Sequence, residues 1–139
     1  MTLLDTHAWI WAVEGNERRI GGRTRRLLAR AESAGALWVS AISLFEIAAL
    51  HTSERLSFTR PVEQWLREAI GNSGARVAEL SPAVAIDAGL IPREALADPI
   101  DRVLVATARQ IGATLVTADE RVLDYSAGAA GVRVHNARR

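Results

Sequence analysis

The chain has 139 residues, 49% of them hydrophobic, which is enough to enclose an apolar core, and we expect a single domain spanning residues 1–139. Its formal net charge of +1 excludes nucleic-acid binding through overall basicity, so any polyanion site must be local. The absence of Cys excludes disulfides, a thiolate nucleophile and a cysteine-based zinc site. No export signal opens the chain, and no apolar run approaches the roughly 18 residues that span a bilayer, which predicts a cytoplasmic protein without membrane contact.

Short β-prone runs alternate along the chain with segments whose apolar residues recur at three- and four-residue spacing. This alternation predicts an α/β sandwich with a mainly parallel sheet. The predicted strands are residues 2–4, 37–39, 76–80, 114–117 and 132–134. The predicted helices are residues 6–13, 22–34, 43–52, 61–70, 82–90, 99–111 and a short helix from Asp119. Glycines, among them Gly71, Gly74 and Gly112, fall where helices are expected to end.

Helix capping explains each acidic residue of interest when it is taken alone. Asp5 suits the N-cap of the first helix, and Asp98 and Asp101 suit the N-cap and third position of a later one. Two further helix-start patterns have the spacing of a capping box, Ser43 with Glu46 and Thr117 with Glu120.

The same acids also share a position relative to the predicted strands. Asp5 follows the first strand, Glu46 the second by less than two helical turns, and Asp119 the fourth. An apolar, buried helix is predicted to begin beside Asp101. Because the carboxyl ends of parallel strands form one edge, these acids should converge on one cleft. Two carboxylates about 4 Å apart repel by ~4 kcal/mol at an effective dielectric near 20, so the cluster needs a compensating cation or raised pKa values, and a divalent metal is the simpler explanation. Oxygen ligands favour Mg²⁺ or Mn²⁺.

Four motifs in order add a wider pattern: LLDTHA at residues 3–8, SAISLFEI at 40–47, DPIDRVLVA at 98–106 and LVTAD at 115–119. Together they resemble the PIN domain, and specifically the VapC-like toxins of bacterial toxin-antitoxin pairs, over nearly the whole chain. The resemblance implies a three-layer α/β/α fold and a magnesium-dependent endoribonuclease that leaves 5′-phosphate and 3′-hydroxyl ends. It also implies a homodimer that a small antitoxin holds inactive, with Mn²⁺ able to replace Mg²⁺.

The resemblance also implies roles for individual residues. Those that match the family acids, and are expected to be catalytic and to bind the metal, are Asp5, Glu46, Asp101 and Asp119. Asp98 is either the helix cap that positions Asp101 or a further ligand, and the cap is the favoured interpretation. Thr6 and Thr117 match small hydroxyl residues beside the acids, where they could bond a ligand carboxylate or a water. Ser40 and Ser43 could do the same, although a cap suits Ser43 better.

A basic run at residues 17–26 is a candidate surface for phosphate. It supplies Arg18, Arg19, Arg23, Arg25 and Arg26. A solvated helix face, or a surface for an acidic partner, explains the run equally well. Arg102 is a further phosphate candidate, although an ion pair with a neighbouring acid is as good an explanation. His7 beside Asp5 is expected to pack or to hydrogen-bond rather than to act as a base.

Large apolar residues in and around the first helix exceed what that helix can turn inward, among them Trp9, Trp11, Phe45 and Trp65. Core packing explains most of them, and the remainder predicts a groove for an antitoxin segment or a dimer contact. Three alternative functions stay open: a housekeeping RNA-processing nuclease, a non-catalytic RNA-binding or protein-binding module, and a signalling receiver domain. The complete absence of Lys counts against the receiver domain.

Overall fold

The computed structural model describes residues 1–128 and 131–139. Its strands are β1 (Thr2–Leu4), β2 (Leu37–Ser40), β3 (Arg76–Ala78), β4 (Thr114–Thr117) and β5 (Arg133–Asn136). Its helices are α1 (Thr6–Val13), α2 (Gly22–Ser33), α3 (Ala41–Thr52), α4 (Val62–Ser73), α5 (Pro82–Leu90), α6 (Pro99–Ile111) and α7 (Glu120–Ser126). The strands form one sheet in the order β3-β2-β1-β4-β5, and every pair is parallel. The predicted three-layer α/β/α class is confirmed.

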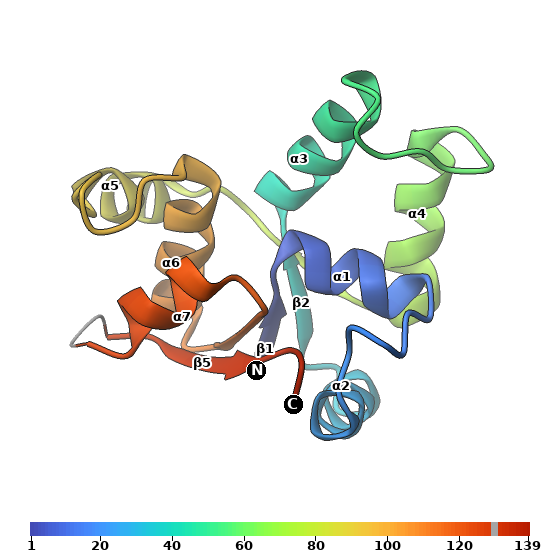
Figure 1. Ribbon diagram of the computed structural model, residues 1–139, viewed down its shortest axis with the longest axis horizontal. Coiled ribbons are helices and arrows are strands. Elements are labelled where there is room, and N and C mark those ends of the chain that lie inside the picture. The colour runs from blue at the N-terminus through green and yellow to red at the C-terminus, as the bar shows by residue number, and fades with distance from the viewer. Residues whose placement is uncertain (129–130) are drawn as a thin grey trace.

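Both faces of the sheet are buried, which is why its strands are apolar along most of their length. Leu4, Val39 and Val116 pack into one cluster with residues of α1, α2 and α4. The next residues along the strands, such as Leu3 and Leu115, pack into a second cluster with α6 and α7. Figure 1 shows α1, α2 and α4 on one side of the sheet and α6 and α7 on the other.

Helix α6 is the buried helix that the sequence predicts, with Leu104 to Ala108 buried in succession. α5 covers its outer side, where Arg109 pairs with Asp87 at 3.0 Å. At its end Gly112 takes the left-handed conformation (φ 69°), as predicted for a helix-terminating glycine. The first turn of α6 therefore lies at a fixed place beside the carboxyl edge of the sheet.

Three sequence predictions about helix ends are wrong. α4 continues through Gly71 and ends at Ser73, and Gly74, with a φ of 63°, provides the left-handed cap. α3 begins at Ala41 rather than Ser43, because β2 passes directly into it and the Ser40 side chain accepts a hydrogen bond from the Ile42 N–H at 3.1 Å. Ser43 is consequently an interior, buried residue of α3 and not a cap.

The third error concerns α7, which has no capping box between Thr117 and Glu120. Asp119 is its N-cap and accepts from the Arg121 N–H at 2.8 Å. The Thr117 hydroxyl instead accepts from the Asp119 N–H at 3.1 Å, which fixes the turn between β4 and α7.

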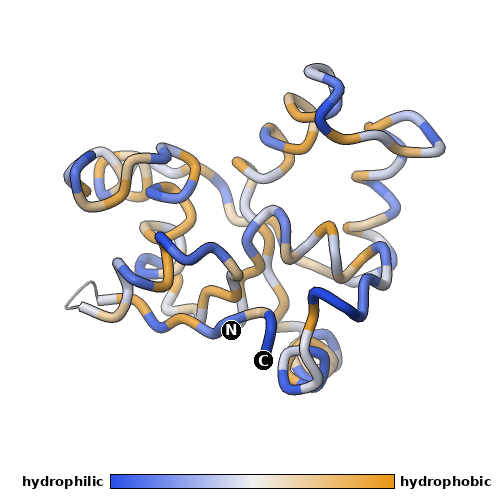
Figure 2. The backbone as a smooth tube through the Cα atoms, in the orientation of Figure 1, coloured by the Kyte–Doolittle hydropathy of each residue, from blue (hydrophilic) through white to orange (hydrophobic). Residues whose placement is uncertain are grey.

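The segment after β5 caps the start of α2. Gly21, the N-cap of α2, has no side chain to do so. The Gly21 N–H donates to the Ala137 carbonyl at 2.9 Å and the Arg23 N–H to the Arg139 carbonyl at 3.1 Å. A Cβ at Gly21 would overlap the Arg139 carbonyl, so this approach requires glycine. Figure 2 shows that both the α1–α2 connection and the end of the chain are hydrophilic.

Within residues 1–128 and 131–139, no helix has both the length and the apolarity needed to span a bilayer.

Candidate active site

A cavity of about 280 Å³ lies at the carboxyl edge of the sheet. Its lining contains five carboxylates, those of Asp5, Glu46, Asp98, Asp101 and Asp119. They come from the ends of β1 and β4, from α3 and from the start of α6. The structure therefore brings together all the acids that the sequence singles out, in a single hollow.

Asp5 both caps a helix and faces this cavity. One carboxylate oxygen accepts from the Ala8 N–H at 2.8 Å, which satisfies the start of α1. The other accepts a short hydrogen bond of 2.5 Å from the Thr117 hydroxyl at the end of β4. Burial raises the pKa of the Asp5 carboxyl, against the opposing effect of these two hydrogen bonds. The capping and functional interpretations of Asp5 are thus compatible.

Asp101 stands on the first turn of α6, where its carboxyl is strongly perturbed. Burial, followed by repulsion from Asp98, Asp119, Asp5 and Glu46, raises its pKa from 3.8 to about 7. Near neutral pH a large fraction of Asp101 is therefore protonated in the absence of a cation. Repulsion from the four neighbouring acids thus adds to the effect of burial at this carboxyl.

Asp98 and Asp119 are helix caps that also line the cavity. Asp98 is the N-cap of α6, and its carboxylate accepts a hydrogen bond from the Ile100 N–H at 2.9 Å. This agrees with the favoured interpretation of Asp98 as a helix cap. Asp119 caps α7, and its carboxylate lies 3.6 Å from the Arg121 guanidinium. Its side chain is 30% exposed, so it remains accessible from the cavity.

Glu46 is held by the packing of α3 against α1. The Thr6 and Ser43 hydroxyls, both buried, lie 2.8 Å apart in a hydrogen bond between these helices. Because Thr6 follows Asp5 directly and Ser43 precedes Glu46 by one helical turn, this bond sets the spacing between the two acids. Of the four predicted hydroxyl residues, Thr117 contacts an acid directly, Thr6 and Ser43 act through their helices, and Ser40 caps α3.

The donor set fits a hard divalent cation by its chemistry, since it consists of carboxylate oxygens whose mutual repulsion a cation would relieve. Geometry alone does not supply such a site. Within the described residues, no three acidic or histidine side chains are grouped so that they could hold one metal ion. The acids share a cavity, and their oxygens must turn toward a common point before they can act as one ligand set.

The basic residues predicted to bind phosphate divide into two groups. Arg19 lines the acidic cavity. Among the described residues of that lining, none of the other predicted phosphate-binding arginines is present, which are Arg18, Arg23, Arg25, Arg26 and Arg102. Arg25 donates to the Ile20 carbonyl at 3.0 Å and borders a different hollow.

Two arginines that the sequence analysis missed, Arg121 and Arg138, also line the cavity. Arg121 follows Asp119 closely, which is a signal that could have indicated it. Arg138 reaches the cavity only through the course of the chain after β5, which nothing local in the sequence predicts. His7 and Trp11 complete this wall, with their ring centroids 6.2 Å apart.

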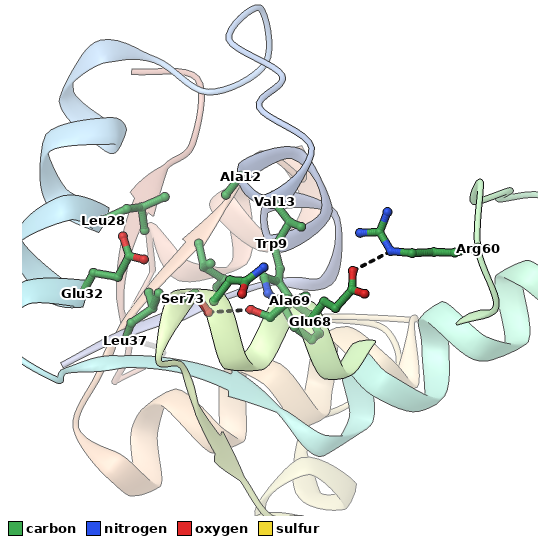
Figure 3. Close-up of a pocket in the computed structure, with 12 residues that line it drawn as sticks. Trp9, Ala12, Val13, Leu28, Glu32, Leu37, Arg60, Glu68, Ala69 and Ser73 are labelled. Carbon is green, nitrogen blue, oxygen red and sulfur yellow. Dashed lines mark hydrogen bonds and ion pairs between the residues drawn. The ribbon is translucent and has the colours of Figure 1, made fainter. Parts of the chain in front are cut away.

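A second cavity, of about 230 Å³, lies between α1, α2 and α4 (Figure 3). Its wall is mostly apolar and includes Trp9, Val13 and Leu28, with Arg60 and Glu68 paired at 2.7 Å at its edge. Trp9 and Trp65 are buried core residues, whereas Phe45 on α3 is 64% exposed. The apolar residues that the sequence singles out thus divide between core and surface.

A parallel sheet with acids at its carboxyl edge agrees with the comparison against known families. The PIN domain model matches residues 2–128, and the chain belongs to the PIN domain family. It is 36% identical over 124 residues to ribonuclease VapC22 of Mycobacterium tuberculosis, covering 88% of this chain and 90% of that protein.

Solved structures give the same fold. One chain of the VapBC2 complex of Rickettsia felis, which is bound to a DNA fragment from its promoter, matches this structure with a TM-score of 0.70 and 14% sequence identity. The match covers 97% of this chain and 97% of that one. A chain of the DNA-bound VapBC complex from Salmonella typhimurium has a TM-score of 0.66 and 23% identity over 97% of this chain and 98% of its own. At these identities the likeness concerns the fold alone.

Proposed function

We propose that this protein is a magnesium-dependent endoribonuclease that acts as the toxin of a toxin-antitoxin pair. It hydrolyses RNA phosphodiester bonds and leaves 5′-phosphate and 3′-hydroxyl ends. The observation that carries the proposal is the convergence of five carboxylates on one cavity, with the pKa of Asp101 raised to about 7. Clustered acids with a strongly perturbed pKa are typical of functional sites. Membership of the PIN domain family and the relative named as a ribonuclease support the same reaction.

The residues divide the work according to their positions. Asp5 and Asp101 would hold the cation, Mg²⁺ or Mn²⁺, and Asp119 would complete the ligand set. Glu46 would bind the cation through a water molecule or orient the water that attacks phosphorus. Thr117 holds the Asp5 carboxylate in place through its 2.5 Å hydrogen bond. Bound Mg²⁺ supplies charge neutralisation at the phosphoryl oxygens and makes water more acidic. Asp98 caps α6 and adds negative charge, without contacting the cation.

The decisive variant is Asp5→Asn, because Asn is a comparably good N-cap and leaves the Ala8 hydrogen bond in place. It removes the negative charge, and we expect cleavage of an RNA oligonucleotide to fall by at least about a hundredfold. Asp124→Asn is the matched control, since Asp124 is exposed on α7 and outside the lining of the acidic cavity.

The measurement is a gel assay with Mg²⁺, with Mn²⁺ and with EDTA, followed by mass spectrometry of the product ends. Melting curves must show that both variants are folded. Full activity of Asp5→Asn, or undiminished cleavage in EDTA, would contradict the proposed chemistry.

The toxin role requires a protein partner, and the second cavity suits one. An amphipathic antitoxin segment can place its apolar face between α1, α2 and α4 (Figure 3). We also propose a homodimer, which the exposed apolar side chains of Phe45, Ile86 and Leu90 would help to form. Induced expression should arrest growth, and the cognate antitoxin should restore it. Harmless expression of an active nuclease would favour the housekeeping alternative instead.

A further inference from the structure

Three arginines line the acidic cavity, and they reach it from three separate parts of the chain; all three are exposed, which places them on its solvent side. Arg19 lies between α1 and α2, Arg121 lies on α7, and Arg138 follows β5. We call these three side chains the guanidinium rim. With a net charge of only +1 over the chain, such a gathering of cations is a local feature of this cavity.

Contacts on the cavity wall position the first member of the rim. The Arg19 guanidinium carbon lies 5.2 Å from the Trp11 ring centroid, which is a cation-π contact. Trp11 is in turn placed by His7, next to Asp5. A guanidinium on a ring face keeps its N–H groups at the edge of its plane, where they can donate to another acceptor.

Backbone hydrogen bonds position Arg138. Its own N–H donates to the Asn136 side chain at 3.0 Å, and the Ala137 N–H donates to the Thr117 carbonyl at 2.8 Å. The Ala137 carbonyl accepts from the Gly21 N–H at the start of α2. Thr117 therefore holds the Asp5 carboxylate through its hydroxyl and the segment that carries Arg138 through its carbonyl. The carboxylate and the backbone segment that carries the arginine are therefore held by the same residue.

The ion pairs of the rim leave its donors available. Arg121 lies 3.6 Å from Asp119 and Arg138 lies 3.7 Å from Glu120, distances longer than a hydrogen bond. The two arginine side chains are 79% and 56% exposed, and exposed pairs of this kind contribute little to stability. An anion at the mouth of the cavity can therefore engage them without disrupting the fold.

We propose that the guanidinium rim binds the RNA backbone phosphates on either side of the scissile bond, and so sets which phosphate lies over the acids. This inference rests on the proposed function. The carboxylates that line the cavity, which we call its floor, repel phosphate, so an RNA strand is best held by the exposed arginines at the mouth. There, guanidinium N–H groups form paired, charge-assisted hydrogen bonds to phosphate oxygens. Affinity then comes from the rim and cleavage from the floor.

The test measures binding separately from cleavage. In an Asp5→Asn background, the affinity for a fluorescein-labelled single-stranded RNA is followed by anisotropy over a range of salt concentrations. Replacing Arg121 or Arg138 by Ala should weaken binding roughly tenfold each. The slope of log K against log salt should decrease by about 0.7 per lost contact. Lys at the same position should restore the slope but only part of the affinity.

Arg67→Ala is the control, because Arg67 is exposed on α4 and outside the lining of the acidic cavity, and it should change neither quantity. In the active protein, the rim variants should raise KM by a larger factor than they lower kcat. If the protein cleaves RNA but the rim variants keep the wild-type salt slope and KM, the rim only neutralises the acids and the inference is overturned. If the protein neither binds nor cleaves RNA, the proposed function itself fails, and the rim with it.

Discussion

Replacing Asp101 by Asn should make the metal-free protein more stable, and only above a certain pH. Its carboxyl has a pKa of about 7 in the fold and 3.8 as the unperturbed value, so the folded state binds the proton more tightly than the unfolded chain. Between these two values the folded state carries more protons, and stability therefore falls as the pH rises. Below about pH 4 Asp101 is neutral in both states and adds no cost. Above about pH 7 the full cost of ionising it in the cavity is present.

The pKa values also bound the size of this effect. Each pH unit between them corresponds to about 1.4 kcal/mol, which gives an upper limit of about 4 kcal/mol. Asp101 is only half-buried and solvent screens its neighbours, so we expect a gain of about 1–2 kcal/mol for Asp101→Asn at pH 8. The variant is nearly isosteric, so packing should change little.

Urea denaturation in EDTA at pH 4.5 and pH 8 measures the difference between wild type and variant. The gain should be small at the lower pH and near its full value at the higher one. Asp124→Asn, on the exposed side of α7, provides the baseline. Saturating Mg²⁺ should stabilise the wild type more than the variant and so reduce the gap. A variant that is less stable at pH 8, or equally changed at both pH values, would refute the electrostatic reasoning.

Two further predictions concern the supports of the site. Asp98→Asn should change the free energy of unfolding by no more than a few tenths of a kcal/mol, because Asn also caps α6. The variant should also retain most of the RNA cleavage. Loss of cleavage would show that Asp98 is a metal ligand. Gly21→Ala should cost about 1–3 kcal/mol in urea denaturation, because its Cβ meets the Arg139 carbonyl, and it should weaken RNA binding as Arg138→Ala does. At the adjacent Gly22 a Cβ would meet only side chains, at 3.7 Å or more. Gly22→Ala should therefore leave stability unchanged or raise it by up to about 1 kcal/mol. A similar loss of stability in both glycine variants would contradict the packing argument.

Much of the fold could be predicted because local patterns and tertiary packing favour the same structure. α1, α5 and α6 have the predicted bounds, since each begins at a clear capping residue or proline. The prediction for α4 failed at Gly71, where packing of an amphipathic face carries the helix past a residue of weak helical propensity. The prediction that Ser43 caps α3 failed for a similar reason, because a serine inside a helix has the same local sequence pattern as a cap. Only the hydrogen bond to Thr6 shows that Ser43 joins α3 to α1.

The acids of the site were predictable because the carboxyl edge of a parallel sheet collects whatever follows its strands. Arg19 was predicted as well, but Arg138 was not, because its position depends on contacts between distant segments. Arg138 is carried to the cavity by the hydrogen bonds that its neighbour Ala137 makes with Thr117 and Gly21, and neither bond has a local pattern. Arg25, in the dense basic run, donates instead to the Ile20 carbonyl. Density of charge in the sequence was therefore a poor guide to which cations face the acids.

The place of β1 at the centre of the sheet has a consequence for biosynthesis. β1 is made first, yet one of its two neighbours is β4, and the Thr117 hydroxyl that bonds Asp5 lies 112 residues further along the chain. Pairings between such distant segments form late, because the closing of a long loop must come first. A nascent chain on the ribosome therefore has no acidic cavity until β4 has emerged. Translation that stops earlier leaves fragments in which Asp5 never meets Thr117 or Asp119.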